Sequence, residues 1–189
     1  RNGFLSALED AGLRDGVNIR LRMANGLGDV AAVQKHAQEF VDEKVDMIVA
    51  VSTPGLQAAL MATRTIPIVF TSVANPYLTR AGTSPTEHLA NVTGIASTAP
   101  IRQGLELIRE TLPSARRVGT LWSPSERNSE YYLDLALAAA PDLGFEIVAV
   151  PVATPSEILL SAERLVTRKI DVLYPISDNV INASFESLG

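Results

Sequence analysis

The stretch VDMIVAVSTPGLQAALMA, residues 45–62, decides the fold expected for this chain. Within it, Met47–Val51 is a short apolar run of the kind that forms a buried strand. Thr53 followed by Pro54 matches an N-cap with proline at the first helical position, so a helix is expected through Ala62. A strand that runs through a short polar turn directly into a helix is the building unit of a parallel α/β sheet.

Three further strand-like segments end in the same way, in a short turn that contains Pro or Asx and opens a helix. These turns are Thr71-Ser72-Val73-Ala74-Asn75-Pro76 after the strand Pro67–Phe70, Ser123-Pro124-Ser125-Glu126 after Val118–Trp122, and Ser177-Asp178-Asn179 after Val172–Pro175. Open α/β folds bind ligands at the carboxyl ends of their parallel strands. Hydroxyls and amides gather at these four turns with almost no catalytic side chains, so the pattern favours a small-molecule binder over an enzyme.

The rest of the chain continues the alternation of helix and strand. Apolar spacing predicts helices around Phe4–Leu13 and over Val30–Lys44, Ile101–Leu112, Glu126–Ala140, Ser156–Lys169 and Asn179–Leu188, and strands over Asn18–Ala24 and Phe145–Val150. Thr154 and Glu157 have the spacing of a capping box. The expected fold class is α/β, with parallel sheets that carry helices on both faces and are joined by right-handed crossovers.

Between Asn75 and Thr98 the pattern loosens, with Gly, Pro and Asn scattered through it. We take this segment as the boundary between two α/β lobes, residues 1–95 and residues 96–189, with a ligand cleft between them and a hinge near Gly94–Thr98. The chain opens directly in a helical pattern without Met, and we expect it to be truncated at both ends.

The composition narrows the possible functions. The 189 residues are 47% hydrophobic, with a mean hydropathy of +0.16, which suffices for a proper core. The net charge of −5 and the dispersed basic residues argue against nucleic-acid binding. The absence of cysteine excludes disulfides, thiolate zinc sites and cysteine nucleophiles. No run of about 18 apolar residues is present, so the sequence contains no candidate membrane span.

Several segments carry a family resemblance, in one order along the chain: Val45–Ala50 with Ser52-Thr53-Pro54, Ala62–Phe70, Asn91-Val92-Thr93-Gly94, Leu112–Gly119, Ser123–Ser129 and Ser177-Asp178-Asn179. In these segments the chain resembles the ABC transporter substrate-binding proteins of the family that includes tryptophan and tyrosine binders, which have the type I periplasmic-binding fold. The resemblance covers nearly the whole chain.

The resemblance implies an exported, bilobed protein that is not an enzyme and uses no cofactor. Such a protein binds a small polar ligand between its lobes, here expected to be an amino acid or a related carboxylate with an apolar or aromatic side chain. It hands the ligand to a membrane permease of an ABC importer, in the periplasm or anchored at the outer face of the cytoplasmic membrane. The family also has a strand before the first helix and a long segment after the last one, so the first lobe is expected to lack its first strand and the second to be incomplete. Asn75 stands where the family usually has Asp, so one carboxylate that would shape ligand charge preference is missing.

The residues expected to contact the ligand lie in or beside the four turns: Ser52, Thr53, Thr71, Ser72, Asn75, Ser123, Asn128, Ser129, Ser177, Asp178 and Asn179. Hydroxyls and backbone N–H groups at a helix start can hold a carboxylate, and the Asp178 carboxylate can pair with an amino group. The same residue types also cap helices, so capping alone stays an open alternative. Asn128 and Ser129 are expected to face the cleft, with Ser125 as the cap of their helix.

Two other functions are considered. Residues 26–31 satisfy the G-x-G-x-x-A spacing of a dinucleotide site, but the acidic residue expected after the next strand is missing, and the turn is better interpreted as flexible with Asp29 capping a helix. A ligand-sensing clamshell of a signalling protein would share the fold and stays open. His36 and His88 have no second ligand at metal spacing and adjoin no predicted turn, so neither a metal nor a catalytic residue is expected.

Overall fold

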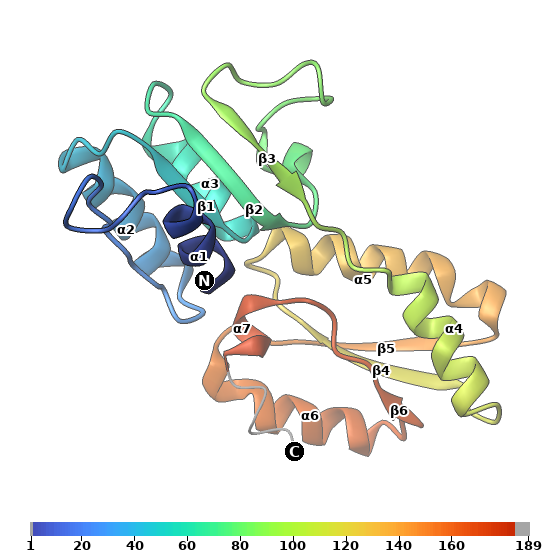
Figure 1. Cartoon of the computed structure of the whole chain (residues 1–189). Coiled ribbons are helices and arrows are strands. Elements are labelled where there is room, and N and C mark those ends of the chain that lie inside the picture. The colour runs from blue at the N-terminus through green and yellow to red at the C-terminus, as the bar shows by residue number, and fades with distance from the viewer. Residues whose placement is uncertain (1, 184–189) are drawn as a thin grey trace.

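The computed structural model describes residues 2–183, which form two three-stranded parallel sheets with helices around them (Figure 1). The strands are β1 (Ile48–Val51), β2 (Ile68–Val73), β3 (Val92–Ala96), β4 (Arg117–Trp122), β5 (Glu146–Pro151) and β6 (Val172–Leu173). The helices are α1 (Asn2–Asp10), α2 (Val30–Asp42), α3 (Thr53–Ala62), α4 (Ile101–Thr111), α5 (Arg127–Ala139), α6 (Ile158–Thr167) and α7 (Asn179–Asn182), with the short 3-10 helices η1 (Pro76–Thr79), η2 (Pro141–Leu143) and η3 (Pro155–Glu157). Within the described residues, no helix combines the length and the apolar character needed to cross a membrane.

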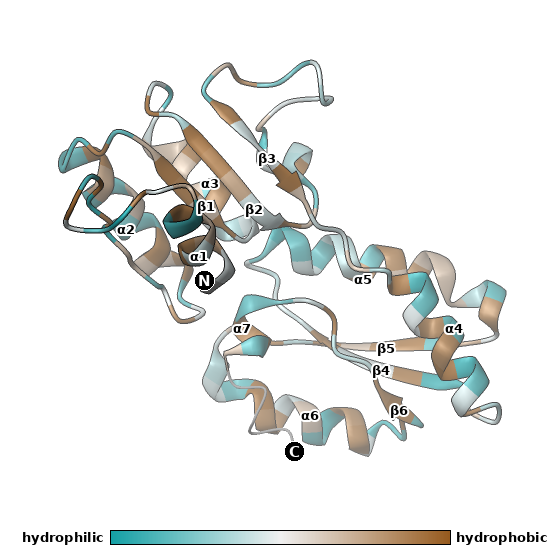
Figure 2. Ribbon diagram, viewed as in Figure 1, coloured by the Kyte–Doolittle hydropathy of each residue, from teal (hydrophilic) through white to brown (hydrophobic). Residues whose placement is uncertain are grey.

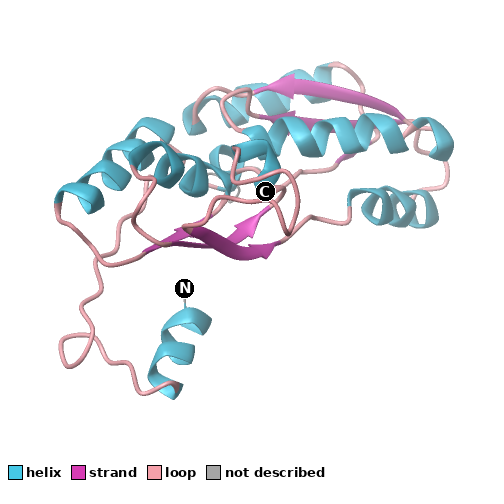
Figure 3. Ribbon diagram, turned by 90° about the horizontal axis from the view of Figure 1, so that it is seen from above, coloured by secondary structure: helices cyan, strands magenta, loops and turns pink. Residues whose placement is uncertain are grey.

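The first sheet has the order β1-β2-β3, with parallel neighbours. Ile48 and Ala50 point into its core, whereas Val49 and Val51 point to the opposite, exposed face. The core joins these inward residues to one side of α3 and to the neighbouring strands through Leu56, Ala59, Leu60, Ile68, Phe70 and Val92. Figure 3 shows α1, which begins at the chain's N-terminus, on the other side of this sheet.

The second sheet has the order β5-β4-β6, so β4 is central and the chain crosses over it between β5 and β6. Val118 of β4 is paired with Ile147 on one side and with Val172 on the other, both in parallel register. Helices α4 and α5 cover one face of the sheet and α6 covers the other (Figure 1). This arrangement agrees with the expected α/β class with parallel sheets and helices.

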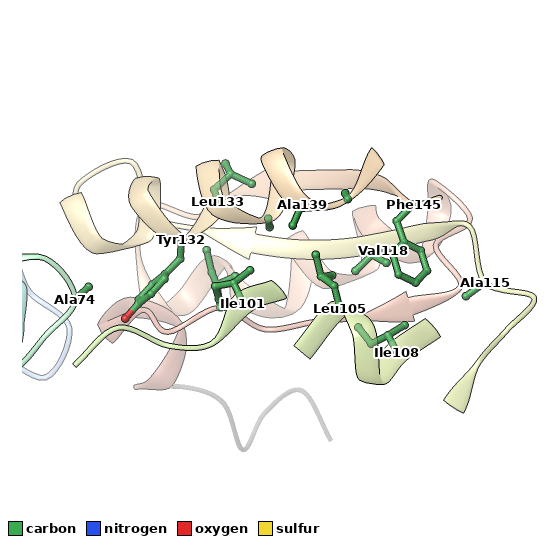
Figure 4. Packing of buried hydrophobic residues seen from close by; sticks show 13 residues of the cluster. Ala74, Ile101, Leu105, Ile108, Ala115, Val118, Tyr132, Leu133, Ala139 and Phe145 are labelled. Carbon is green, nitrogen blue, oxygen red and sulfur yellow. The ribbon is translucent and has the colours of Figure 1, made fainter. Parts of the chain in front are cut away.

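The core of the second sheet lies between β4, α4 and α5 (Figure 4). Leu105 of α4 and Val118 of β4 are fully buried there, with Tyr132 and Phe145 beside them. Figure 2 shows hydrophobic residues concentrated along the strands and on the helix faces turned toward them. Burial of these apolar side chains is the main force that holds each sheet to its helices.

The segment between the two sheets is tied to α5 by the buried side chain of Tyr132. Its hydroxyl donates a hydrogen bond to the Ser97 carbonyl at 3.2 Å and accepts one from the Ala99 N–H at 3.1 Å. Thr98 in turn donates to the Ala74 carbonyl at 2.7 Å. These bonds define the path of the chain where it leaves the first sheet for the second.

The strand expected over Asn18–Ala24 is not formed, and this prediction was wrong. The Asn18 side chain accepts a hydrogen bond from the Arg14 N–H at 2.7 Å, and the Asp15 side chain accepts one from the Leu21 N–H at 2.8 Å. Asx side chains that bond nearby backbone groups offer the chain an alternative to a strand ladder. A single bridge between Asp15 and Ile19 is the strand-like pairing that remains in this segment.

The first sheet differs from expectation in three more places. The strand predicted to end at Phe70 continues to Val73, so Thr71 and Ser72 belong to β2 and not to a turn. Strand β3 lies inside the segment 75–98, where the sequence pattern predicts no strand. Thr93 and Gly94 weaken the apolar pattern of this strand, although Val92 is buried. The N-cap of α3 is Ser52, whose hydroxyl accepts from the Gly55 N–H at 3.5 Å, and not Thr53.

In the second half of the chain, the differences concern helix ends. Glu126, not Ser125, is the N-cap of α5. The helix expected from Ser156 begins as the 3-10 turn η3, and the Thr154 side chain makes no capping bond; the Glu157 carboxylate instead accepts from the Ala153 N–H at 3.1 Å. Of the helix predicted over Asn179–Leu188, the structure has Asn179–Asn182 as α7, and residues 184–189 lie outside the described part of the chain.

The core assignment predicts the outcome of a matched pair of substitutions in α4. Leu105→Ala should lower the free energy of unfolding by about 2–5 kcal/mol, because it leaves a cavity in a packed core. Leu107→Ala, two residues away at a side chain that is 59% exposed, should change it by no more than about 0.5 kcal/mol. Equal effects of the two variants in denaturant unfolding would contradict the assignment of this core.

Candidate functional site

The carboxyl end of β1 holds an unusual backbone conformation at Ser52. Its φ of 78° and ψ of 163° lie in a region that residues other than glycine rarely adopt. The Ser52 N–H donates to the Thr71 carbonyl at 3.1 Å, and α3 begins at the next residue. Ser52 is therefore held in a strained turn by the neighbouring strand and by its own capping bond.

The carboxyl end of β2 has a second strained residue. Ser72 has a φ of 56°, and the pairing register between β2 and β3 shifts between Phe70 and Val73. Such irregularities in a strand are common beside binding sites, where they redirect side chains. The Thr71 and Ser72 side chains are exposed here.

The turns after β1 and β2 contact one another. The buried Thr53 hydroxyl accepts a hydrogen bond from the Ala74 N–H at 3.4 Å. One residue further, the Asn75 side chain accepts from the Tyr77 N–H at 3.0 Å and so caps η1. Asn75 thus has a capping role in the structure, and ligand contact by this half-buried residue stays a prediction.

The carboxyl ends of β4 and β6 are joined through Ser123 and Asp178. The Ser123 N–H donates to the Ser129 hydroxyl at 2.8 Å and to the Asp178 carboxylate at 3.0 Å. The other carboxylate oxygen of Asp178 accepts from the Ile181 N–H at 2.9 Å and caps α7. The three polar side chains are at most 1% exposed. Both oxygens of Asp178 are thus engaged within the chain, as the capping interpretation requires, and its pairing with a ligand amine stays a prediction.

A second buried carboxylate, Glu126, lies beside this link, and the sequence pattern indicated it only as a helix start. One oxygen accepts hydrogen bonds from the Asn128 amide at 3.0 Å and from the Asn179 N–H and amide at 3.1 and 2.7 Å. The Asn128 amide also donates to the Ser177 carbonyl at 3.1 Å. This network connects the start of α5 to the start of α7.

The Glu126 network leaves two buried acceptors without a partner among the described residues. They are the second oxygen of Glu126 and the side-chain oxygen of Asn128. Burial raises the pKa of the Glu126 carboxyl, and the nearby negative charge of Asp178 raises it further, while the hydrogen bonds from Asn179 and Asn128 act in the opposite direction. The environment therefore favours the neutral form of this carboxyl more than water does.

The two pairs of turns are brought together by the way the sheets are placed. Helix α3, which starts at the end of β1, contacts α5, which starts near the end of β4. Figure 1 shows the end of β2 directed toward the first turn of α5. All four predicted turns therefore lie at the junction of the two sheets.

The predicted residues divide into two groups by exposure. Thr71, Ser72 and Ser177 are exposed and Ser52, Asn75 and Asn179 are half-buried, so their side chains are accessible to a ligand. The remaining side chains are buried and shape the turns: Thr53, Ser123, Asn128, Ser129 and Asp178. The sequence pattern predicted all of these positions as ligand contacts but gave no means of separating the exposed group from the buried one.

The Gly26–Asp29 turn, considered as a dinucleotide site, uses its acidic residue to cap α2. One Asp29 side-chain oxygen accepts from the Ala31 and Ala32 N–H groups at 2.8 and 3.2 Å. This matches the capping interpretation of the turn. Among the described residues, no group of three His, Asp or Glu side chains is arranged to hold a metal ion.

Comparison with known proteins agrees with this architecture. The family model of the ABC transporter substrate binding proteins matches residues 1–189, and the chain belongs to this family. Over 184 residues it is 38% identical to a tyrosine-binding protein of Clostridioides difficile strain R20291, a match that covers 97% of this chain and 53% of that protein. The chain thus spans about half the length of this curated relative.

Solved structures of bacterial proteins show the same type I periplasmic-binding fold. A conserved domain protein of Vibrio cholerae matches with a TM-score of 0.92 at 31% identity, over 100% of this chain and 63% of that one. The ABC domain from Streptococcus pneumonia in complex with L-Trp matches with a TM-score of 0.90 at 25% identity, over 99% and 63%. A ligand-free, open substrate-binding protein from Clostridium difficile matches with a TM-score of 0.60 at 35% identity, over 97% and 62%.

The buried Glu126 carboxyl predicts a specific pH dependence of stability. Its pKa is raised in the folded protein, so at a pH between its ordinary value and the raised value the folded state binds a proton that the unfolded state has lost. This contribution to stability is full below the ordinary pKa and is lost as the pH rises through the raised one. Glu126→Gln cannot ionise, so its melting temperature should fall less than that of the wild type between about pH 5 and pH 8.

The control is Glu130→Gln, which makes the same change of charge at an exposed position of α5. It should follow the wild-type pH profile. A Glu126→Gln profile parallel to that of the wild type would show that the Glu126 pKa does not differ between the folded and unfolded states.

Proposed function

We propose that this chain is the ligand-binding part of an exported, extracytoplasmic solute-binding protein of an ABC importer. Its ligand is a small polar molecule, an amino acid or a related carboxylate, bound where the four turns meet. In this proposal the two lobes are residues 1–95 and 96–189, and the segment 94–98 acts as the hinge between them.

The observation that carries the proposal is the pair of strained serines at neighbouring strand ends. Ser52, with a φ of 78°, directly follows β1, and Ser72, with a φ of 56°, is the next-to-last residue of β2. Backbone conformations of this kind cost about 1–3 kcal/mol each and persist mainly at ligand-binding and other functional sites. Here they present hydroxyls and backbone groups at the carboxyl edge of a parallel sheet, which is where open α/β folds bind ligands.

Closure of the two lobes provides the mechanism. A ligand that contacts Ser52 or Ser72 on one side and Ser177 or Asn179 on the other binds the closed arrangement better than an open one. It therefore shifts the population toward the closed arrangement by the difference in its affinity for the two. The closed shape is what a permease of the importer would recognise.

The ligand class rests on the relatives together with the chemistry of the turns. Hydroxyls and N–H groups at the start of α3 suit a carboxylate, and the named relatives include a tyrosine binder and a tryptophan complex. Aromatic amino acids are therefore the first ligands to examine. The substrate-binding family itself consists of proteins that bind and do not catalyse.

The test is a thermal-shift and calorimetric screen of the full-length protein. L-tyrosine, L-tryptophan, aliphatic amino acids and benzoate are added in increasing concentration. A ligand that binds only the folded state raises the melting temperature with the logarithm of its concentration. A shift with amino acids or small carboxylates is the expected result, and no shift with any of them would overturn the proposal.

A pair of serine substitutions tests which end of the second sheet contacts the ligand. Ser177→Ala removes an exposed hydroxyl just after β6, at the carboxyl end of the sheet, and should weaken ligand binding about 2- to 12-fold if that hydroxyl bonds the ligand. Ser114→Ala removes an exposed hydroxyl before β4, at the amino end, and should leave the affinity unchanged. Equal affinities of the two variants in calorimetry would remove Ser177 from the site.

A further inference from the structure

Gly28 lies in the turn before α2, yet its nearest neighbours belong to the second half of the chain. A Cβ atom built at this position would lie 3.4 Å from the Ala183 Cβ, 3.4 Å from the Pro155 Cγ and 3.5 Å from the Asn179 carbonyl oxygen. Pro155 begins η3, ahead of α6, and the other two residues belong to or follow α7. The turn that opens α2 thus touches the elements around the second sheet, and Figure 1 shows the chain ahead of α2 reaching toward α7.

The backbone conformation at Gly28 favours glycine, whereas a Cβ atom there would make ordinary van der Waals contact with its three neighbours. Its φ of +85° lies in the region that L side chains rarely adopt. Gly12 and Gly16 have φ values of +77° and +76°, but nothing lies within 4 Å of a Cβ built at either one. Gly28 therefore differs from these two glycines in its contact and not in its backbone.

One of the residues that contact Gly28, Asn179, belongs to the candidate site. Asn179, whose carbonyl faces Gly28, donates from its N–H and its amide to the Glu126 carboxylate. Asp178 caps the same helix and bonds Ser123 at the end of β4. A displacement of α7 relative to the Gly28 turn would therefore move the polar turn after β6.

On the opposite side of the contact, the turn is held to its own half of the chain. Asp29 caps α2 through two N–H groups, and the Asp29 N–H donates to the Gly26 carbonyl at 2.8 Å. A Cβ at Gly26 would collide with the Val33 side chain at 2.4 Å, so the turn is packed closely on α2. The turn is thus anchored on α2 and presents Gly28 to α7.

We infer that the Gly26–Asp29 turn is a positioning element that places the first-sheet half of the molecule against α7 and η3, and that the lack of a large side chain at Gly28 permits this approach. This inference rests on the proposed function, because the approach matters when a ligand is held between the halves. The contact lies outside the strained serine turns, and Gly28 itself is not among the residues expected to bind the ligand, although its neighbour Asn179 is. The structure also matches the tryptophan complex with a TM-score of 0.90 and the ligand-free, open protein with a TM-score of 0.60.

The experiment compares substitutions at Gly28 and Gly16 in the full-length protein. Gly28→Leu and Gly16→Leu impose the same strained φ, but only the leucine at position 28 meets α7 and η3. We expect Gly28→Leu to weaken amino-acid binding at least tenfold and Gly16→Leu to bind as the wild type does. Gly28→Ala and Gly16→Ala form a milder pair that should bind alike, because a Cβ at position 28 makes only ordinary van der Waals contact with its neighbours.

A distance measurement separates this inference from the proposed function. The 189 residues contain no cysteine, so Lys35→Cys in α2 and Glu163→Cys in α6 provide two exposed positions for spin labels. Gly28→Leu should lengthen the distance between the labels relative to Gly16→Leu, with or without ligand. Identical distances in the two variants would overturn the inference even if the protein binds amino acids. If no ligand binds the wild type, the proposed function fails, and the distances without ligand still decide whether Gly28 permits the approach.

Discussion

The constraint on which the second sheet depends is the need to satisfy backbone groups at the carboxyl ends of its strands. A parallel strand that ends inside the molecule leaves N–H groups that must find partners. The Ser123 N–H finds two, the Ser129 hydroxyl and the Asp178 carboxylate. Because Asp178 also caps α7, one carboxylate holds together two turns that are 55 residues apart in the sequence. The position of each turn at the candidate site follows from this link.

In the first sheet, the carboxyl ends of the strands have strained backbone conformations. Ser52 and Ser72 adopt positive φ values near the ends of β1 and β2, and the Thr53 hydroxyl accepts a hydrogen bond from the Ala74 N–H. The two sheets thus present different kinds of surface to the junction between them. One offers strained serines with exposed or half-buried hydroxyls, and the other a buried carboxylate network with Ser177 and Asn179 at its rim. The proposed function places an amino acid or a related carboxylate between these two surfaces.

Much of the fold was predictable because its signals are local. Apolar runs located β1, β4 and β5, and helical spacing located α2, α4 and α5 within a few residues. The errors arose where a neighbour decides the outcome. Residues 18–24 form no strand because Asp15 and Asn18 bond nearby backbone groups. Strand β3 forms because β2 offers its edge to a short segment whose apolar pattern is interrupted by Gly94.

The sequence by itself determined the α/β class, the family and the four turns where a ligand is expected, because strand length, helical period and turn chemistry are properties of short segments. Tertiary structure alone decided which polar residues are exposed and which are buried and hydrogen-bonded within the chain. Asp178 and Glu126 are both acidic residues beside a helix start, and only the tertiary structure buries both where the starts of α5 and α7 meet. It also decided that Gly28 touches α7. The physical reason is that these hydrogen-bond partners are more than fifty positions apart in the sequence, and the contacts of Gly28 more than a hundred, so no local pattern can register them.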